Sequence, residues 1–149
     1  MSVSVIICTC NRVASLRQTL DALGKVRIPQ GYQAEAIIVD NGSADGTADL
    51  VRNTTLSNMR VVYLFEPEKG KSNALNSGLA LASGEILLFT DDDVVPSEDW
   101  IEQMLLCFDT ARCDAVVGKV KLAPHLERPW VKSLERIYLA VIDFEAGMP

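Results

Sequence analysis

The sequence contains a single histidine, His125, in a proline-flanked loop for which we expect no catalytic role, and it contains no Cys-x-x-Cys pair. Its four cysteines are therefore interpreted as reduced packing residues of a cytosolic protein rather than as metal ligands or disulfides; they are Cys8, Cys10, Cys107 and Cys113. Basic residues are outnumbered, with 14 lysines and arginines against 20 aspartates and glutamates. That balance argues against a general nucleic-acid-binding surface, although local amides or a metal ion can still attract an anionic ligand.

Long hydrophobic runs are missing as well. The apolar stretch at residues 2–10 is too short to cross a bilayer, and it lacks the basic start and the cleavage site of a signal peptide. We therefore expect a cytoplasmic protein, with association at the cytoplasmic face of a membrane left open. The chain also lacks the Gly-x-x-x-x-Gly-Lys-[Ser/Thr] pattern of a P-loop and, after its first predicted strand, the Gly-x-Gly-x-x-Gly pattern of nicotinamide oxidoreductases.

The chain does contain an alternation of strand-like and helix-like segments. Apolar, largely β-branched runs predict strands at residues 3–9, 34–39, 60–65, 85–89 and 115–120. Apolar residues at helical spacing predict helices at residues 13–23, 45–52, 72–83, 96–108 and 130–145. With 149 residues, 48% of them hydrophobic, the chain can form one globular domain. The pattern predicts an α/β fold with a mainly parallel sheet and right-handed crossovers.

Clusters of polar residues follow the first four predicted strands. They occupy residues 9–12, 40–43, 66–71 and 91–93. Ligands of open parallel sheets bind outside the carboxyl ends of the strands. We therefore expect the four clusters to meet at one edge of the sheet and to form a binding site there.

The last cluster is a run of three aspartates, Asp91, Asp92 and Asp93, directly after a buried strand. Neighbouring carboxylates repel one another by roughly 1–4 kcal/mol at about 4 Å, which a cation would relieve. Side chains at i and i+2 of an extended segment point the same way, so Asp91 and Asp93 are expected to share a Mg²⁺ or Mn²⁺ site while Asp92 faces elsewhere. The competing interpretation is a solvated acidic turn that caps a helix.

Two other clusters also have an ordinary and a functional interpretation. Asp40 precedes an Asn-Gly pair, which is frequent in simple turns, but opposite the aspartates it becomes a candidate acceptor for a nucleobase N–H or a ribose hydroxyl. Lys69 and Lys71 precede a predicted helix, so they and its first amides could face phosphate oxygens. The alternative is a surface loop with solvated lysines.

These motifs, in this order, resemble the family 2 glycosyltransferases of the GT-A fold. The segment VSVIICTCNR is similar to that family's opening strand, with Cys10 in a position that usually carries an aromatic residue. The segment AIIVDNGSADGT resembles its second-strand motif. The segment KGKSNALNSGLALASGEILLFTDDD resembles its run from Gly-Lys to Asp-x-Asp, in the form of the polysaccharide-synthase branch. The likeness covers about residues 2–121.

The resemblance implies a Rossmann-like nucleotide-diphospho-sugar transferase fold, with helices on both faces of the sheet, and a role for each matching residue. The nucleotide pocket would be lined by Thr9, Asn11 and Arg12, next to Asn41 and to Asp40, which would accept from the base, typically uracil. The diphosphate and the donor sugar would be lined by Lys71, Asn73 and Asn76. The ribose and the metal would be approached by Asp91 and Asp92, with Asp93 as the main metal ligand.

The implied reaction is transfer of a sugar from a UDP- or GDP-linked donor to a hydroxyl of a saccharide or lipid-linked acceptor, with Mn²⁺ or Mg²⁺ as cofactor and by the family's usual inverting course. In that family the general base lies well downstream of the aspartates, so we expect it beyond Pro149. Residues 1–123 are accordingly interpreted as the nucleotide-sugar-binding core of a longer enzyme, and residues 124–149 as the start of its acceptor-side segment. Nucleic acid is not an expected partner, and the oligomeric state stays open.

Two other functions fit parts of the pattern. A sugar-1-phosphate nucleotidyltransferase would share the sheet type and the metal, but its glycine-rich signature is missing from residues 8–20. A non-catalytic module that binds nucleotide or metal and regulates a partner would fit the missing general base.

Overall fold

Four of the apolar segments form a parallel sheet in the part of the chain that the structure describes. The structure is a computed structural model, and it describes residues 1–111, 114–118 and 121. In these residues the elements follow in the order β1 (Ser2–Thr9), α1 (Val13–Leu23), β2 (Gln33–Asp40), α2 (Thr47–Arg52), β3 (Arg60–Phe65), α3 (Lys71–Leu81), β4 (Ile86–Asp91) and α4 (Trp100–Ala111). The strands lie in the order β3-β2-β1-β4, and each neighbouring pair is parallel.

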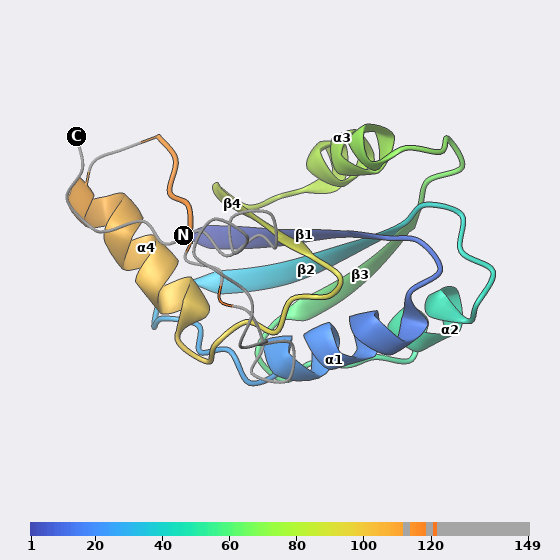
Figure 1. Ribbon diagram of the computed structural model, residues 1–149. Helices are drawn as coiled ribbons and strands as arrows, with labels where there is room; N and C mark the ends of the chain where they lie inside the picture. Colours follow the sequence, from blue (N-terminus) through green and yellow to red (C-terminus); the bar gives the residue numbers. More distant parts are fainter. Residues whose placement is uncertain (112–113, 119–120, 122–149) are drawn as a thin grey trace, which may run out of the picture. The chain divides into compact units, whose positions relative to one another are not determined.

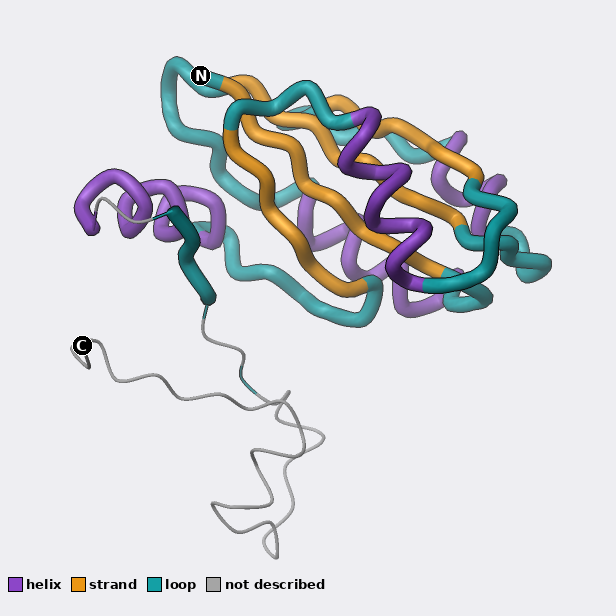
Figure 2. The backbone as a smooth tube through the Cα atoms, turned by 90° about the horizontal axis from the view of Figure 1, so that it is seen from above, coloured by secondary structure: helices purple, strands orange, loops and turns teal. Residues whose placement is uncertain are grey.

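The central strands are apolar on both sides because both faces of the sheet are covered (Figures 1 and 2). On one face α3 packs over β1 and β2, where Ala74 meets Ile6 and Val39. The opposite face carries a larger core to which α1, α2 and the first residues of α4 contribute; its helical members are Leu16, Leu20, Leu23, Val51, Ile101 and Leu105. The predicted α/β fold with helices on both faces is confirmed.

Helix α3 lies unusually close to the sheet. A Cβ atom added to Gly78 would come within 2.8 Å of the Ile6 Cγ2 atom and 3.1 Å of the Val39 Cγ2 atom. Only a residue without a side chain fits there unless the packed neighbours move. This contact fixes the height of α3 above the sheet and therefore the position of its first residue, Lys71, beside the carboxyl ends of the strands.

Several predicted boundaries are corrected by the structure. Strand β4 continues to Asp91 instead of ending at Phe89, because its pairing with β1 runs on to Cys8. Helix α4 begins at Trp100 instead of residue 96, after a turn in which the Trp100 N–H donates to the Ser97 carbonyl at 3.0 Å. Residues 115–118 form no strand, contrary to the prediction for residues 115–120. A β-branched run has only a propensity, and no described strand supplies these residues with the necessary hydrogen bonds.

The chain divides into two units, Met1–Leu105 and Leu106–Pro149, and of the second the structure describes residues 106–111, 114–118 and 121. All predicted site residues belong to the first. Residues 119–120, His125 and the predicted helix at 130–145 lie outside the described residues, as does the predicted boundary between residues 123 and 124. Among the residues that are described, none of the helices combines the length and the apolar character needed to cross a bilayer.

Candidate functional site

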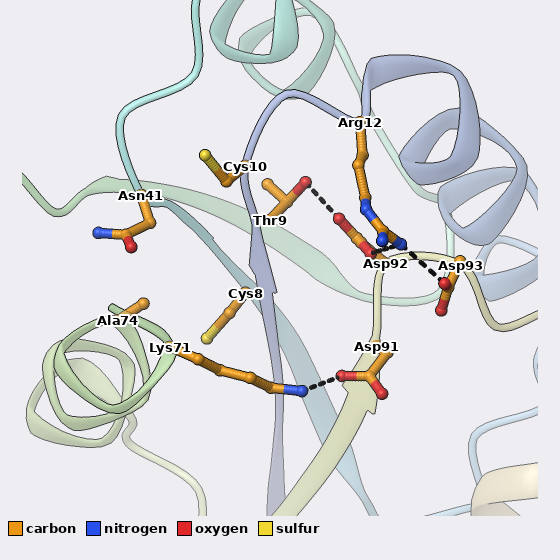
Figure 3. Close-up of a pocket in the computed structure, with 10 residues that line it drawn as sticks. All are labelled: Cys8, Thr9, Cys10, Arg12, Asn41, Lys71, Ala74, Asp91, Asp92 and Asp93. Atoms are coloured by element: carbon orange, nitrogen blue, oxygen red, sulfur yellow. Dashed lines mark hydrogen bonds and ion pairs between the residues drawn. The ribbon is translucent and has the colours of Figure 1, made fainter. Parts of the chain in front are cut away.

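The parallel register brings the ends of the strands together at one edge. Thr9 at the end of β1 lies opposite Asp40 of β2, and Cys8 lies opposite Asp91 of β4. A pocket of about 330 Å³ opens there, between the end of the sheet and the first turns of α3 (Figure 3). It is lined by Cys8, Thr9, Cys10, Arg12, Asn41, Lys71, Ala74, Asp91, Asp92 and Asp93. Seven of the predicted site residues are in this set, and the remaining four, Asn11, Asp40, Asn73 and Asn76, are not.

The three aspartates occupy different environments. Strand β4 ends at Asp91, and the next two residues form a turn. The Asp92 side chain is only 8% exposed and accepts a hydrogen bond of 2.7 Å from the Thr9 hydroxyl, whereas the side chains of Asp91 and Asp93 are 56% and 53% exposed. The assumption of an extended segment through Asp93 is therefore wrong. Metal binding by Asp91 and Asp93 stays a prediction.

Two cations of the chain neutralise most of this acidic charge. The Lys71 Nζ atom lies 2.6 Å from Asp91 Oδ1, and the Arg12 Nη1 atom lies 2.7 Å from Asp93 Oδ2 and 3.4 Å from Asp92 Oδ1 (Figure 3). The hydrogen bond to Asp91 raises the pKa of the Lys71 ammonium, and the hydrogen bond to Asp93 raises the pKa of the Arg12 guanidinium. Among the described residues of the pocket, three carboxylates thus face two cations, which leaves one negative charge.

The backbone that carries the aspartates is held by a residue that the sequence reasoning missed. The buried Thr19 hydroxyl of α1 lies 3.0 Å from the Asp92 carbonyl oxygen and 2.9 Å from the Val94 carbonyl oxygen. A signal for this residue exists in the sequence, because Thr19 is a polar residue on the apolar stripe that Leu16 and Leu20 define. Such a residue needs a polar partner inside the fold.

Asp40 is bound into the fold itself. Asp40 is only 1% exposed. One of its carboxylate oxygens accepts a hydrogen bond from the Ser43 N–H at 2.8 Å, and the other accepts one from the Tyr63 hydroxyl at 3.0 Å. Burial, and then the hydrogen bond to Asp40, raise the pKa of Tyr63, so this hydroxyl remains a donor. The role of Asp40 toward a nucleobase stays a prediction. Tyr63, which orients this carboxylate, had no recognisable signal in the sequence.

The loops after β1 and β2 are joined by side chains. The Asn11 N–H donates to Ser43 Oγ, and the Asn11 Oδ1 atom accepts from the Ala44 N–H, both at 2.8 Å. Asn11 has a φ of +54°, a left-handed conformation that asparagine tolerates better than most residues. In return, Asp45 accepts from the Val13 N–H at the start of α1, at 2.9 Å. Asn11 therefore shapes the site through its loop.

The remaining candidates lie around α3. Asn73 and Asn76 are exposed residues of this helix, and the Asn73 amide donates to the Lys69 carbonyl at 3.2 Å. Cys8 lines the pocket, where burial raises the pKa of its thiol, which is therefore neutral near pH 7. Cys8, Cys10 and Cys107, the cysteines that the structure describes, are free thiols.

Comparison with known sequences gives a family match over almost the whole chain. Residues 4–147 match the family described as Glycosyl transferase family 2. The glycosyltransferase AglE of Haloferax volcanii is 33% identical over 120 residues, which are 80% of this chain and 39% of that protein. The probable glycosyltransferase YdaM of Bacillus subtilis is 33% identical over 125 residues, which are 80% of this chain and 30% of that protein. The chain thus spans less than half the length of these relatives.

Solved structures share the fold of the described residues. The mannosyltransferase PcManGT from Pyrobaculum calidifontis, in complex with GDP-Man and Mn²⁺, gives a TM-score of 0.65 at 32% identity, over 71% of this chain and 32% of that one. TarS from S. aureus, in complex with UDP-GlcNAc, gives a TM-score of 0.67 at 27% identity, over 88% of this chain and 38% of that one. The GT-A fold that the sequence motifs implied is confirmed.

Proposed function

Because the chain belongs to the family 2 glycosyltransferases, we propose that it binds a nucleotide-diphosphate sugar and serves the transfer of that sugar to an acceptor hydroxyl. One observation carries the proposal: a single pocket brings Arg12 and Lys71 against three consecutive aspartates. A diphosphate requires cationic partners, and a divalent ion requires carboxylate oxygens, so this pocket can serve both. The relatives solved with GDP-Man and UDP-GlcNAc support a GDP- or UDP-linked donor.

The aspartates suit a Mn²⁺ or Mg²⁺ ion. In residues 1–111, 114–118 and 121, no three histidine, cysteine, aspartate or glutamate side chains are arranged as a metal cage. Mg²⁺ does not require one, because it takes one or two carboxylates and completes its shell with phosphate oxygens and water. We assign Asp93 and Asp91 as the carboxylates that would hold the ion, since both are more than half exposed. A bound ion supplies Lewis-acid stabilisation of the departing diphosphate.

Arg12 and Lys71 are the chain's own partners for phosphate. In the free protein they lie against Asp93 and Asp91. When the donor is bound, we propose that both turn toward its phosphate oxygens, where their charge stabilises the negative charge that grows on the leaving diphosphate. Because their side chains are 53% and 65% exposed, changes of rotamer are sufficient for this movement.

The nucleoside and the donor sugar are assigned to the residues on either side of the diphosphate. We propose Thr9, Asn11 and Asp40 as neighbours of the nucleoside. Asp40 would accept from the base through a second lone pair of a carboxylate oxygen that already serves the fold. The exposed Asn73 and Asn76 of α3 are the proposed neighbours of the donor sugar.

The acceptor side completes the proposal. Inverting transfer to a saccharide or lipid-linked hydroxyl needs a general base that takes the proton of the acceptor. We propose that a longer gene product supplies this base, because AglE and YdaM are more than twice as long as the part matched here. Complete transferase activity of the 149-residue chain alone would contradict the proposal that the general base lies in a longer gene product.

We also propose a cytoplasmic location, which the free thiols of Cys8, Cys10 and Cys107 support.

A thermal-shift panel tests the donor and the ion together. UDP-GlcNAc, UDP-glucose and GDP-mannose are each added with and without Mn²⁺ or Mg²⁺. We expect at least one to raise the melting temperature only when the ion is present, and we expect Asp93→Ala to remove this effect. Stabilisation that depends on neither the ion nor Asp93 would show that the site is assigned wrongly. Ion-dependent binding without transfer or hydrolysis by the full-length gene product would instead favour a non-catalytic binding module.

A further inference from the structure

Asn41, the first residue after β2, has a side chain that is committed to another loop. Its Nδ2 atom donates to the Glu66 carbonyl at 3.0 Å and to the Glu68 carbonyl at 2.7 Å, and its Oδ1 atom accepts from the Gly70 N–H at 2.8 Å. The backbone N–H of Asn41 also donates to the Thr9 carbonyl at 2.9 Å. One buried side chain therefore holds both ends and the middle of the segment that connects β3 to α3.

This segment determines where α3 begins. Gly70 precedes the helix with a φ of +132°, a conformation that strains any other residue, and its carbonyl accepts from the Ala74 N–H in the first turn. The next residue is Lys71, whose ammonium reaches Asp91 across the pocket. The hydrogen bond from Gly70 to Asn41 is therefore one residue away from the lysine that we assign to the donor's phosphates.

A second side chain ties the same segment to the body of α3. The Glu66 carboxylate accepts from the Glu68 N–H at 2.7 Å and from the Ser77 hydroxyl. The hydrogen bond from Ser77 lowers the pKa of Glu66, so this carboxylate is charged near neutral pH. Glu66 therefore fixes the segment relative to α3, the helix that follows it, whereas Asn41 fixes the segment relative to the sheet.

We propose that Asn41 is a positioning residue that sets the first turn of α3 and the Lys71 ammonium at the donor's phosphates, without contacting the donor itself. The inference rests on the proposed function, and it changes the role that the sequence resemblance gave to Asn41. Both hydrogens of the amide nitrogen are used by the two carbonyl groups, so that nitrogen has no hydrogen left to donate to a ligand. Placement matters because small displacements of a charged group from its phosphate weaken electrostatic binding steeply.

Hydrogen exchange in the free protein tests the first half of the proposal. Asn41→Ala removes all three side-chain bonds, and Asn41→Asp keeps an acceptor for the Gly70 N–H but loses both donors. We expect the amides of Gly70 and Ala74 to exchange at least about 10-fold faster in both variants, while those of the central strands β1 and β2 are unchanged. In Asn41→Asp the reason is that the carboxylate repels the Glu66 and Glu68 carbonyl oxygens to which the amide nitrogen donated, so the segment moves away from its remaining acceptor. Unchanged exchange at Gly70 in both variants overturns the proposal. If Asn41→Ala does not fold, Asn41→Asp alone decides.

A double-mutant cycle with Lys71 tests the second half. The dissociation constants of UDP-GlcNAc and GDP-mannose are measured by calorimetry in the presence of Mn²⁺ for the wild-type protein, Asn41→Ala, Lys71→Ala and the double variant. We expect about a 10-fold weaker affinity for Asn41→Ala and no further loss, within about 2-fold, when Asn41→Ala is added to Lys71→Ala. Independent, multiplying losses would mean that Asn41 contacts the donor directly, and they overturn the proposal.

Asn58 is a matched control within the same chain. Its Nδ2 atom also donates to two carbonyl oxygens, those of Leu23 at 2.8 Å and Val26 at 2.7 Å, but it holds the loop after α1. We expect Asn58→Ala to lower stability as much as Asn41→Ala does and to leave donor affinity unchanged. An equal loss of donor affinity in both variants would reduce the effect of Asn41 to general destabilisation and overturn the proposal. If the wild-type protein binds none of the three nucleotide sugars of the thermal-shift panel, the proposed function fails. If it binds at least one and Asn41→Ala binds that one equally well, only this inference fails.

Discussion

Both ends of the sheet carry acidic residues, but these residues differ in their burial and in their hydrogen-bond partners. At the amino end Glu35 of β2 is buried, with a side chain that is 8% exposed. Its carboxylate accepts from the Ser4 hydroxyl at 2.7 Å, from the Ser83 N–H at 2.9 Å and from the Ser83 hydroxyl at 2.7 Å, and it pairs with Arg60. Every partner of this carboxylate belongs to the protein, so the amino-end cluster is complete without a ligand.

At the carboxyl end the pairs are open to solvent. Lys71 and Asp91 are both more than half exposed, as are Arg12 and Asp93. Exposed ion pairs contribute little to stability, since water solvates the separated charges almost as well. The difference indicates that the amino-end carboxylate stabilises the fold, as the buried Asp40 and Asp92 do at the carboxyl end, whereas the exposed Asp91 and Asp93 remain open to a ligand. Substitutions at the two ends should therefore separate stability from binding.

The largest effect on stability is expected from Glu35→Ala. This change removes the acceptor of the buried Ser4 hydroxyl and of the Ser83 N–H and hydroxyl, and it leaves Arg60 without its partner, which together cost about 3 kcal/mol of unfolding free energy. Urea denaturation measures this loss, and calorimetry with a nucleotide sugar should show unchanged affinity in the folded fraction. Arg60→Ala is the control, with a smaller loss because the Arg60 side chain is 70% exposed. A loss below about 1 kcal/mol for Glu35→Ala would mean that the two ends are not different.

The second expected effect is a pH dependence that originates at the amino end. Burial raises the pKa of Glu35, but the hydrogen bonds from Arg60, Ser4 and Ser83 outweigh it and lower the pKa from 4.5 to about 2. A carboxylate with a lowered pKa in the folded state adds stability above its unfolded pKa, and this stability is lost as the pH falls toward about 2. In Glu35→Gln, unfolding free energy between pH 4.5 and 2 should therefore fall by about 2 kcal/mol less than in the wild type. Parallel pH curves would contradict this assignment.

A third, smaller effect is expected from Thr19→Val, which connects the framework to the pocket. The substitution keeps the shape of the side chain but removes the hydroxyl that lies against the carbonyl groups of Asp92 and Val94. We expect a loss of about 1 kcal/mol of stability and a donor affinity that is several-fold weaker, because the turn that carries the aspartates is less well held. Thr54→Val removes a comparable hydroxyl, one that donates to the Leu50 carbonyl, and should leave donor affinity unchanged. Equal binding losses in the two variants would rule out a specific role of Thr19.

Much of the fold and the position of the pocket could be predicted from the sequence. The runs around Ile6, Ile37 and Leu88 are apolar enough to identify three strands, and parallel strands necessarily bring the residues after them to one edge. For this reason the sequence alone could predict that Arg12, Lys71 and the aspartates meet in one pocket. The strands around Ile6 and Ile37 are buried, whereas in β4 Leu87 and Phe89 are exposed, so the prediction of a buried strand before the aspartates is wrong. The predicted strand at 115–120 failed at residues 115–118 because composition alone does not supply a pairing partner.

The roles of individual polar residues could not be predicted in the same way. Asp40 and Asn41 stand side by side in the sequence, yet one accepts from Tyr63 and the other holds the segment before α3. These partners lie 23 and 29 residues away, and only the pairing of β2 with β3 brings them within hydrogen-bond distance. Sequence patterns describe neighbours along a helix or strand, so they identify the edge of the sheet but not the hydrogen bonds that are made there.

The smallest effect on stability, and the clearest separation of stability from binding, is expected from Lys71→Gln. Its ion pair with Asp91 is exposed, so the melting temperature should change by less than about 2 °C. Binding should change in two opposite directions. The free protein should bind Mn²⁺ more tightly, because the Lys71 ammonium no longer competes with the ion for Asp91. The nucleotide sugar should bind more weakly, because its phosphates lose a cationic partner. Titration of Mn²⁺ followed by electron paramagnetic resonance measures the first change, and calorimetry with the donor measures the second.

Lys69→Gln is the control that distinguishes direct competition between Lys71 and Mn²⁺ for Asp91 from a simple change in net charge. It removes the same charge two residues earlier, from an exposed position that does not belong to the described lining of the pocket. A long-range effect of net charge would strengthen Mn²⁺ binding equally in both variants, and it would be reduced by added salt. A contact effect, in contrast, should be confined to Lys71→Gln. If the two lysine variants bind Mn²⁺ and donor alike, Lys71 does not compete for Asp91, and the open pairs of the carboxyl end are surface charges like any others.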